Sequence, residues 1–331
     1  MEPLPGTVVT VTGERDPATL GTVLPHEHLL GDFTPLAAGP LDHAPLTMEL
    51  LGAAALGAAN RDDQILDDEG LAAAEARDRA GTVVDLTTAD LGRDPAALRR
   101  IAEATGLAVV MGAGLHRPLS DSSADTLTAA LLRELVEGVD GVRAGIIGEL
   151  AALDPADPAE RALLTAAARA SAATGAAISL TLGPDPAVQQ RVLDLLAAEG
   201  ADLTRVAVGR CDPLAADPGA LEPLLERGVF VQFDQLGRLP TVYSRWDDQD
   251  VAAAVIELAR RGRSRQLLLS QDTRAKSRLL AYGGGGYGFL AQQFLPYLAM
   301  LGADPALAET VTVHNPRRLL THPAPAQRSD Q

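Results

Sequence analysis

The chain has 331 residues and carries 28 Lys and Arg against 44 Asp and Glu, which gives a formal net charge of −16. A protein that binds phosphate groups needs a basic face, so this balance argues against nucleic acid and against an anionic membrane surface as partners. The single cysteine, Cys211, excludes an intrachain disulfide. Since no signal-like segment or long apolar span stands out, we expect a cytoplasmic protein.

Eight short apolar runs recur along the chain, and each closes on a polar residue or glycine. They cover residues 21–26, 82–86, 108–112, 144–149, 177–182, 205–209, 229–233 and 266–270. Alanine-rich stretches with leucines at helical spacing lie between them, at 94–105, 158–174, 187–199 and 248–261. Asp94 before Pro95 is typical of a helix start. Alternation of strands and helices indicates a parallel sheet, and eight strands favour closure as a (β/α)8 TIM barrel.

No internal linker or low-complexity tract interrupts this pattern, so the sequence predicts one domain over residues 1–331. Residues 1–20 are expected to form a short hairpin ahead of the first barrel strand. The tail at 321–331 is rich in proline and polar residues, and we expect it to be frayed.

The strongest local motif is the pair His26 and His28 at the end of the first run. Residues i and i+2 of a strand face the same side, so both imidazoles can point into the barrel mouth at one metal ion. Glu149 closes the fourth run, and Asp272 follows the eighth, which neighbours the first in a closed barrel. Two imidazoles and two carboxylates suit Zn²⁺ or a similar divalent ion. A chance pair of histidines, and an ordinary salt bridge for Glu149, are the alternatives.

Further segments extend this motif into an ordered set along nearly the whole chain. They lie at 20–29, 82–87, 91–94, 104–106, 144–149, 268–272, 281–287 and 315–319. In this order the segments resemble the phosphotriesterase family of the amidohydrolase superfamily. The resemblance implies a (β/α)8 barrel enzyme with two divalent metals, bridged by a carboxylated lysine or by a glutamate. For one of these metals it implies four ligands: His26, His28, the bridging Glu149 and Asp272.

The other metal of the family depends on a histidine after the fifth strand and another after the sixth, and both differ here. Thr181 and Arg210 stand at these two positions. A threonine is a poor neutral ligand, and a guanidinium is a permanent cation that cannot ligate. We therefore expect a single divalent ion, with zinc favoured, and Arg210 paired with Glu149. An ordinary salt bridge of Arg210 with Asp212 or Asp234 is the alternative.

These features predict a metal-dependent hydrolase that acts on a small ester, lactone, amide or phosphoester. Asp272 would serve as ligand and general base, and Arg210 would stabilise the developing oxyanion. An alternative is a repurposed lyase, cyclase or isomerase of a specialised biosynthetic pathway, free of metal if Arg210 neutralises Glu149. A catalytically inactive binding protein is the third hypothesis, and the four convergent ligands argue against it.

The loops after the strands supply the expected substrate contacts, which are Thr181, Arg210, His116, Asp234, Trp246 and Tyr282. The glycine-rich segment 283–288 follows the eighth strand and lacks the later acidic residue of a dinucleotide fingerprint, so no nucleotide cofactor is expected. The expected partner is a small-molecule substrate, with no nucleic acid and no membrane. A homodimer is compatible with the family resemblance.

Overall fold

The computed structural model describes residues 6–37, 39–118, 122–151, 153–242 and 244–323, and a sheet of eight parallel strands forms its centre. Strands that follow one another along the chain are neighbours in the sheet. In order they are β3 (Val23–Glu27), β6 (Thr82–Asp85), β7 (Ala108–Ala113), β8 (Ile146–Ala151), β9 (Ala177–Thr181), β10 (Val206–Gly209), β11 (Phe230–Phe233) and β12 (Leu267–Leu269). Each strand overlaps one of the eight predicted runs, so the predicted strand order is confirmed.

Hydrogen bonds across the seam between β3 and β12 bring the two edges of the sheet together. The His26 amide donates to Ser270 Oγ at 3.0 Å, and the Asp272 amide donates to His26 O at 3.1 Å. The buried Glu27 carboxylate accepts from Ser270 Oγ at 2.8 Å and from the Gln271 amide at 2.9 Å. The predicted α/β barrel is therefore confirmed as a nearly closed one.

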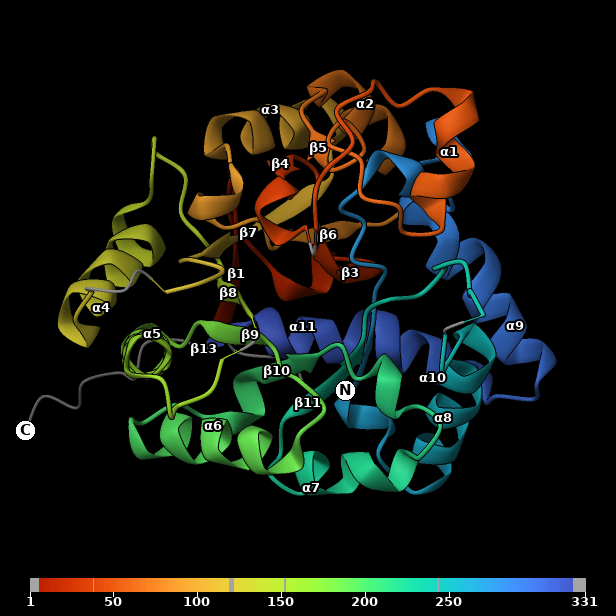
Figure 1. The fold of residues 1–331 in the computed structure, drawn as a ribbon. Helices are drawn as coiled ribbons and strands as arrows, with labels where there is room; N and C mark the ends of the chain where they lie inside the picture. Colours follow the sequence, from red (N-terminus) through yellow and green to blue (C-terminus); the bar gives the residue numbers. More distant parts are fainter. Residues whose placement is uncertain (1–5, 38, 119–121, 152, 243, 324–331) are drawn as a thin grey trace, which may run out of the picture.

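Helices surround the strands on all sides (Figure 1). They are α1 (Met48–Ala55), α2 (Glu69–Ala76), α3 (Pro95–Thr105), α4 (Ala124–Leu132), α5 (Pro158–Thr174), α6 (Pro186–Ala198), α7 (Glu222–Leu225), α8 (Asp248–Arg260), α9 (Leu295–Met300), α10 (Pro305–Glu309) and α11 (Asn315–Leu320). Four of them, α3, α5, α6 and α8, match the predicted helical stretches. Asp94 caps α3 as expected, because its Oδ1 accepts from the Ala97 amide at 2.8 Å. Among the described helices, none has the length and apolar character needed to cross a membrane.

The hydrophobic core divides into two clusters, one on each face of the curved sheet. A smaller cluster takes at least one side chain from every barrel strand and fills the barrel interior, with Val23, Val84, Ile146, Phe230 and Leu268 among its members. The larger cluster joins the outer faces of the strands to the helices. Parallel strands covered on both faces are apolar throughout, which explains why the predicted runs are continuous rather than alternating.

A separate three-stranded antiparallel sheet joins the two ends of the described chain. Two of its strands come before the barrel in sequence and the third comes after it. β1 (Gly6–Thr10) pairs with β2 (Gly13–Arg15), so the predicted hairpin is confirmed for its described part. β13 (His322–Pro323) pairs with the other edge of β1, and His322 Nε2 donates to Gly145 O at 2.9 Å. The expected fraying is thus wrong for these two residues, because they complete a sheet edge. Residues 324–331 lie outside the described residues.

A two-stranded antiparallel sheet pairs β4 (Gly31–Asp32), which follows the first barrel strand, with β5 (Ile65–Leu66).

Candidate functional site

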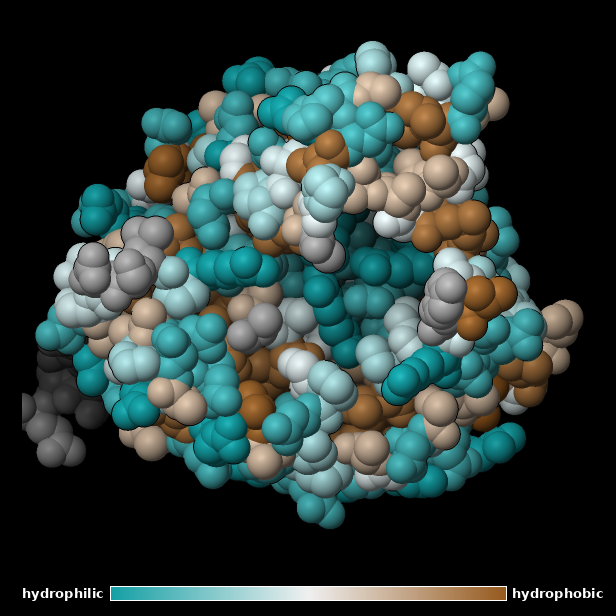
Figure 2. All heavy atoms as spheres, in the orientation of Figure 1, coloured by the Kyte–Doolittle hydropathy of each residue, from teal (hydrophilic) through white to brown (hydrophobic). Residues whose placement is uncertain are grey.

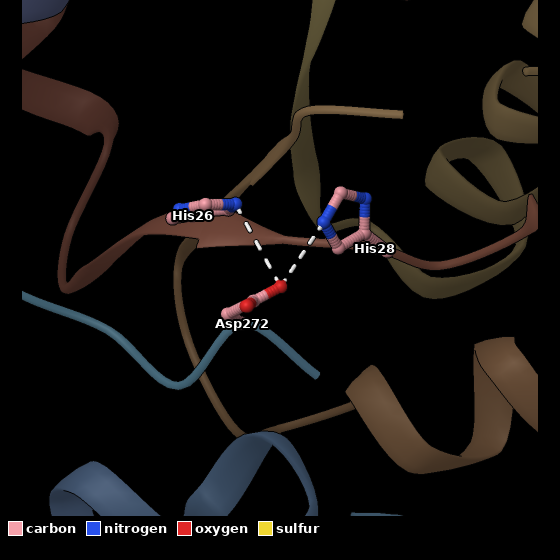
Figure 3. A group of neighbouring side chains, drawn as sticks. All are labelled: His26, His28 and Asp272. Atoms are coloured by element: carbon pink, nitrogen blue, oxygen red, sulfur yellow. Dashed lines mark ion pairs between the residues drawn. The ribbon is translucent and has the colours of Figure 1, made fainter. Parts of the chain in front are cut away.

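Three side chains meet at the carboxyl end of the barrel strands. His26 and His28 come from the end of β3, Asp272 comes from the segment after β12, and all three are buried. One ligand atom from each lies within 4.8 Å of the other two. Figure 3 shows both imidazoles and the carboxylate pointing toward one another. Asp272 Oδ1 lies 3.3 Å from His28 Nε2 and 3.8 Å from His26 Nε2.

The hydrogen bonds of the two imidazoles fix which nitrogen faces this centre. His26 Nδ1 donates to Asp234 Oδ2 at 2.7 Å, because a carboxylate can only accept. His28 Nδ1 lies 2.9 Å from Thr87 Oγ1, whose hydroxyl donates to Leu30 O at 3.0 Å and therefore accepts from the ring. Each Nδ1 thus carries a proton that points away, and each Nε2 can offer a lone pair to the centre.

Buried polar atoms without a hydrogen-bond partner show whether a metal ion would fit between these side chains. His26 Nε2, His28 Nε2, Asp272 Oδ1 and Glu149 Oε2 are buried and have no hydrogen-bond partner among the described residues. Buried polar atoms without partners are rare and costly, and here they converge. Ligand atoms held 2.0–2.2 Å from a tetrahedral ion lie roughly 3.3–3.6 Å apart, close to the distances measured between the imidazoles and Asp272. The donor set therefore fits a divalent ion such as zinc.

Glu149 lies at the edge of this group rather than within it. Glu149 belongs to β8, and its Oε2 is 3.6 Å from His26 Nε2. It is not part of the group formed by His26, His28 and Asp272, whose ligand atoms all lie within 4.8 Å of one another. Thr181 Oγ1 donates a hydrogen bond to Glu149 Oε1, and the Arg210 guanidinium lies 3.8 Å from the same oxygen. The structure thus brings all four expected ligands to one place. Thr181 and Arg210 contact Glu149 through Oε1, while its Oε2 faces His26.

Local shifts in strand register direct these side chains into the mouth. The pairing of β3 with β6 shifts between Leu24 and Glu27, and that of β8 with β9 shifts between Ile147 and Leu150. Because of the first shift, Val23 fills the barrel interior while His26, three residues later, faces the same side.

Charge around the centre sets the pKa values of its groups. Burial works against the charged form of His26, but the carboxylates of Glu149 and Asp234 outweigh it and raise the pKa of His26 well above its usual value. Burial raises the pKa of Glu149, yet His26 and Arg210 bring it well below the ordinary range. For Asp272, burial raises the pKa, but the charge of Arg274 and the nearby His28 imidazole outweigh it and bring the pKa well below its usual value. The centre therefore holds two ionised carboxylates that favour a cation.

Arg210 follows β10 in a left-handed backbone conformation, with φ of 53°. Its Nη2 lies 3.5 Å from Asp272 Oδ2 and 3.8 Å from Glu149 Oε1. The ion pairs of its guanidinium therefore go to two of the expected ligands, while its backbone amide donates to Asp234 Oδ1 at 2.9 Å. This geometry matches the expected pairing with Glu149 and adds Asp272.

The remaining expected contacts separate into near and remote residues. His116 is buried, and its Nδ1 lies 3.6 Å from Glu149 Oε2 with no hydrogen-bond partner among the described residues. Asp234 lies behind His26, and both its oxygens are occupied by hydrogen bonds, so it does not face a substrate. Trp246 and Tyr282 pack half-buried against the large core cluster, and no hydrogen bond or ion pair in the described part of the chain links them to the centre.

Sequence reasoning missed two arginines and a tyrosine at this site. Arg238, in the loop after β11, donates to Asp272 Oδ2 at 3.0 Å, and Arg274 Nε lies 3.7 Å from the same oxygen. The buried Tyr287 hydroxyl donates to His28 O at 2.6 Å, which anchors the glycine-rich segment below the site. The closeness of Arg274 to Asp272 in sequence was the one signal that could have pointed to it.

A nearly closed eight-stranded barrel with convergent imidazole and carboxylate atoms at its strand ends defines a barrel enzyme of the amidohydrolase type. The chain belongs to the phosphotriesterase family, whose model matches residues 6–320. This confirms the family resemblance seen in the sequence.

The relatives of this chain include N-acetyltaurine hydrolases from several vertebrates. It is 28% identical to the N-acetyltaurine hydrolase of Xenopus tropicalis, over 97% of this chain and 99% of that protein. The resiniferatoxin-binding protein of Rhodobacter sphaeroides is 35% identical with a TM-score of 0.89, over 96% of this chain and 95% of that one. The phosphotriesterase homology protein of Escherichia coli, complexed with phosphate in its active site, is 28% identical with a TM-score of 0.78, over 92% and 99%. The protein is a hydrolase of this family.

Proposed function

We propose that the protein hydrolyses a small ester, lactone, amide or phosphoester with one divalent ion, zinc, held by His26, His28 and Asp272 and flanked by Glu149. The observation that carries the proposal is the convergence of four buried atoms without hydrogen-bond partners, one from each of these side chains. The Nε2 lone pairs of both imidazoles are oriented toward the same point by Asp234 and Thr87.

A single ion is proposed because the positions of the second metal's histidines hold Thr181 and Arg210. Thr181 uses its hydroxyl as a donor to Glu149, so its oxygen is engaged in positioning that carboxylate. The Arg210 guanidinium lies within 4 Å of both Glu149 and Asp272 and supplies a fixed positive charge there. A second divalent cation beside a guanidinium would be repelled.

The residues around the ion divide the chemical tasks between them. A divalent ion, when bound, polarises a substrate oxygen and lowers the pKa of water. Arg210, whose side chain is 26% exposed, can donate hydrogen bonds to the oxyanion that develops at the attacked carbonyl or phosphoryl group. Asp234 and Thr181 are assigned positioning roles, for His26 and Glu149 respectively.

Proton transfer is assigned to His116 rather than to Asp272. One Asp272 oxygen faces the imidazoles and the other faces the arginines, so neither is left for a substrate proton. His116 has an unpartnered Nδ1 beside Glu149, and burial lowers its pKa, which keeps the ring neutral and able to accept a proton.

The test combines a substrate screen with removal of metal. Aryl esters, γ-lactones and N-acetyltaurine, the last suggested by the names of the relatives, would be assayed before and after chelation and after zinc is added back. We expect hydrolysis of at least one class, lost with the chelator and restored by zinc. His28→Ala should abolish it, while His314→Ala, on the helical segment Thr310–His314, should not. Full activity after chelation would overturn the proposal and favour metal-free chemistry.

A further inference from the structure

Three arginines converge on a single oxygen of the site. Asp272 Oδ2 lies 3.0 Å from Arg238 Nη2, 3.5 Å from Arg210 Nη2 and 3.7 Å from Arg274 Nε. The arginines come from the loops that follow the neighbouring strands β10, β11 and β12, so the barrel itself brings them together. We call Arg210, Arg238 and Arg274 the arginine cluster.

The cluster has far more hydrogen-bond donors than the protein uses. Each guanidinium carries five N–H donors. Among the described residues, the hydrogen bonds of the three side chains are two, one from Arg210 and one from Arg238, and both go to the same Asp272 oxygen. Arg210 Nε is buried with no hydrogen-bond partner. The remaining donors are available to a ligand.

The cluster also has more positive charge than its neighbours balance. Its ion pairs in the described part of the chain reach only Asp272 and Glu149. These two carboxylates are also the ones that would neutralise a bound divalent ion. A local surplus of positive charge in a chain of net charge −16 is a feature of this place and not of the surface as a whole.

Two of the three arginines, Arg238 and Arg274, open onto a cavity large enough for a small molecule. Their side chains are 22–35% exposed, and Arg238 and Arg274 line a cavity of about 510 Å³ that reaches Asp272. Phe33 and Leu36 form an apolar wall of the same cavity. Figure 2 shows the molecule in the orientation of Figure 1. Its surface is hollowed near the centre of this view, and hydrophilic residues lie inside the hollow.

We propose that the arginine cluster binds an anionic group of the substrate, a carboxylate, sulfonate or phosphate, on the Asp272 side of the barrel mouth. This rests on the proposed hydrolytic function and names its substrate class: a small molecule whose scissile bond lies near the ion while an oxyanion elsewhere in the molecule is held by guanidinium forks. The short apolar wall suits the carbon chain between the two ends. Guanidinium matches oxyanions in geometry as well as charge, which a single lysine would not.

Two esters test this specificity: 4-nitrophenyl butyrate, which is neutral, and mono-4-nitrophenyl glutarate, which adds a terminal carboxylate to the same acyl chain. The wild-type protein should prefer the anionic ester in kcat/KM. Arg238→Met and Arg274→Met should each lower the preference for the anionic ester, measured as the ratio of the two kcat/KM values, about 10- to 100-fold, the effect of losing a charge-assisted hydrogen bond. Arg227→Met is the matched control. Arg227 forms an ion pair with Asp194 and precedes β11, so it lies at the end of that strand opposite to Arg238. Equal losses on both esters, or a wild-type preference for the neutral one, would overturn the proposal.

Calorimetric titration with glutarate and with inorganic phosphate separates this idea from the hydrolytic function, because it needs no turnover. Binding that weakens about tenfold or more in Arg238→Met and Arg274→Met, but not in Arg227→Met, supports the subsite even if neither ester is cleaved. Phosphate binding that is lost in His26→Ala yet unchanged in both arginine variants would show an anion held by the metal alone, and would count against the cluster. No binding of either anion to the wild-type protein would do the same.

Discussion

His26 Nδ1 and Asp234 Oδ2 lie 2.7 Å apart, although 208 positions separate the two residues in sequence. The bond joins the end of the first strand to the residue after the seventh, and these two strands lie on either side of the eighth in the nearly closed barrel. Because the carboxylate holds the Nδ1 proton, His26 presents Nε2 to the centre, and the negative charge makes that nitrogen a better donor to a cation. Asp234 itself is fixed by the Arg210 amide and by Gln232 Nε2, at 2.9 and 3.0 Å.

Asp234→Asn is therefore expected to weaken zinc binding about 10- to 100-fold, the usual effect of removing a carboxylate behind a histidine ligand. The substitution leaves the shape of the side chain intact, so the fold should persist. Competition titration with a chromophoric chelator measures the affinity. Asp94→Asn, which keeps a good cap on α3, should leave the affinity unchanged. An unaltered zinc affinity in Asp234→Asn would contradict the proposed role.

The double substitution Thr181→His and Arg210→His is expected to raise the metal content from about one to about two ions per chain. It supplies two neutral imidazoles beside Glu149 and removes the guanidinium that lies 3.8 Å from that carboxylate. Elemental analysis of the purified protein provides the count. Neither single substitution should suffice, because each leaves one ligand missing. A double variant that still holds one ion would show that these positions do not exclude the second.

Glu27→Gln is expected to lower the free energy of unfolding by roughly 2–3 kcal/mol, since an amide cannot accept all of the donors that surround this buried group. The Glu27 carboxylate accepts from Ser270 Oγ, the Gln271 amide and the Thr273 amide, at 2.8, 2.9 and 2.9 Å. These bonds join β3 to the segment that carries Asp272. Urea unfolding measures the change, with the exposed Glu14→Gln as control. A loss below about 0.5 kcal/mol would mean that the seam depends little on Glu27.

The buried carboxyl of Asp212 predicts a pH-dependent stability. Burial, with repulsion from Asp234, raises the pKa of Asp212 from 3.8 to about 7. Between these values the folded protein holds a proton that the unfolded chain releases, so the free energy of unfolding falls as pH rises, by at most about 1.4 kcal/mol per unit. Asp212→Asn should remove this contribution and flatten the slope between pH 5 and 7. The slopes come from urea unfolding at several pH values, and a slope equal to that of the wild type would contradict the assignment.

The strand order and the meeting of the proposed ligands at one place followed from sequence because both depend on local patterns. Eight apolar runs with intervening helical stretches specify parallel strands, and their carboxyl ends share one face of the barrel. His26, Glu149 and Asp272 each stand at or just beyond such an end, so their meeting could be anticipated without knowing any side-chain direction.

Side-chain direction at the site could not be anticipated in the same way. Strict alternation would turn His26 away from the face of Val23, and only the register shift in β3 brings both to the inside. Asp234 ends a strand as Asp272 does, and nothing in the sequence says that it lies behind His26 and not in the cavity. Arg238 lies in an aperiodic loop, and its direction is set by a contact with a residue 34 positions away.

We propose that His26, His28 and Asp272 hold one divalent ion with Glu149 beside them. The sharpest test is the metal content of the purified protein, measured by elemental mass spectrometry. We predict close to one zinc per chain in the wild type and in His314→Ala, and close to none in His26→Ala and His28→Ala. A wild-type protein that contains no metal and takes up none from zinc-supplemented buffer would contradict the claim, as would an ion content that is unchanged by both histidine substitutions.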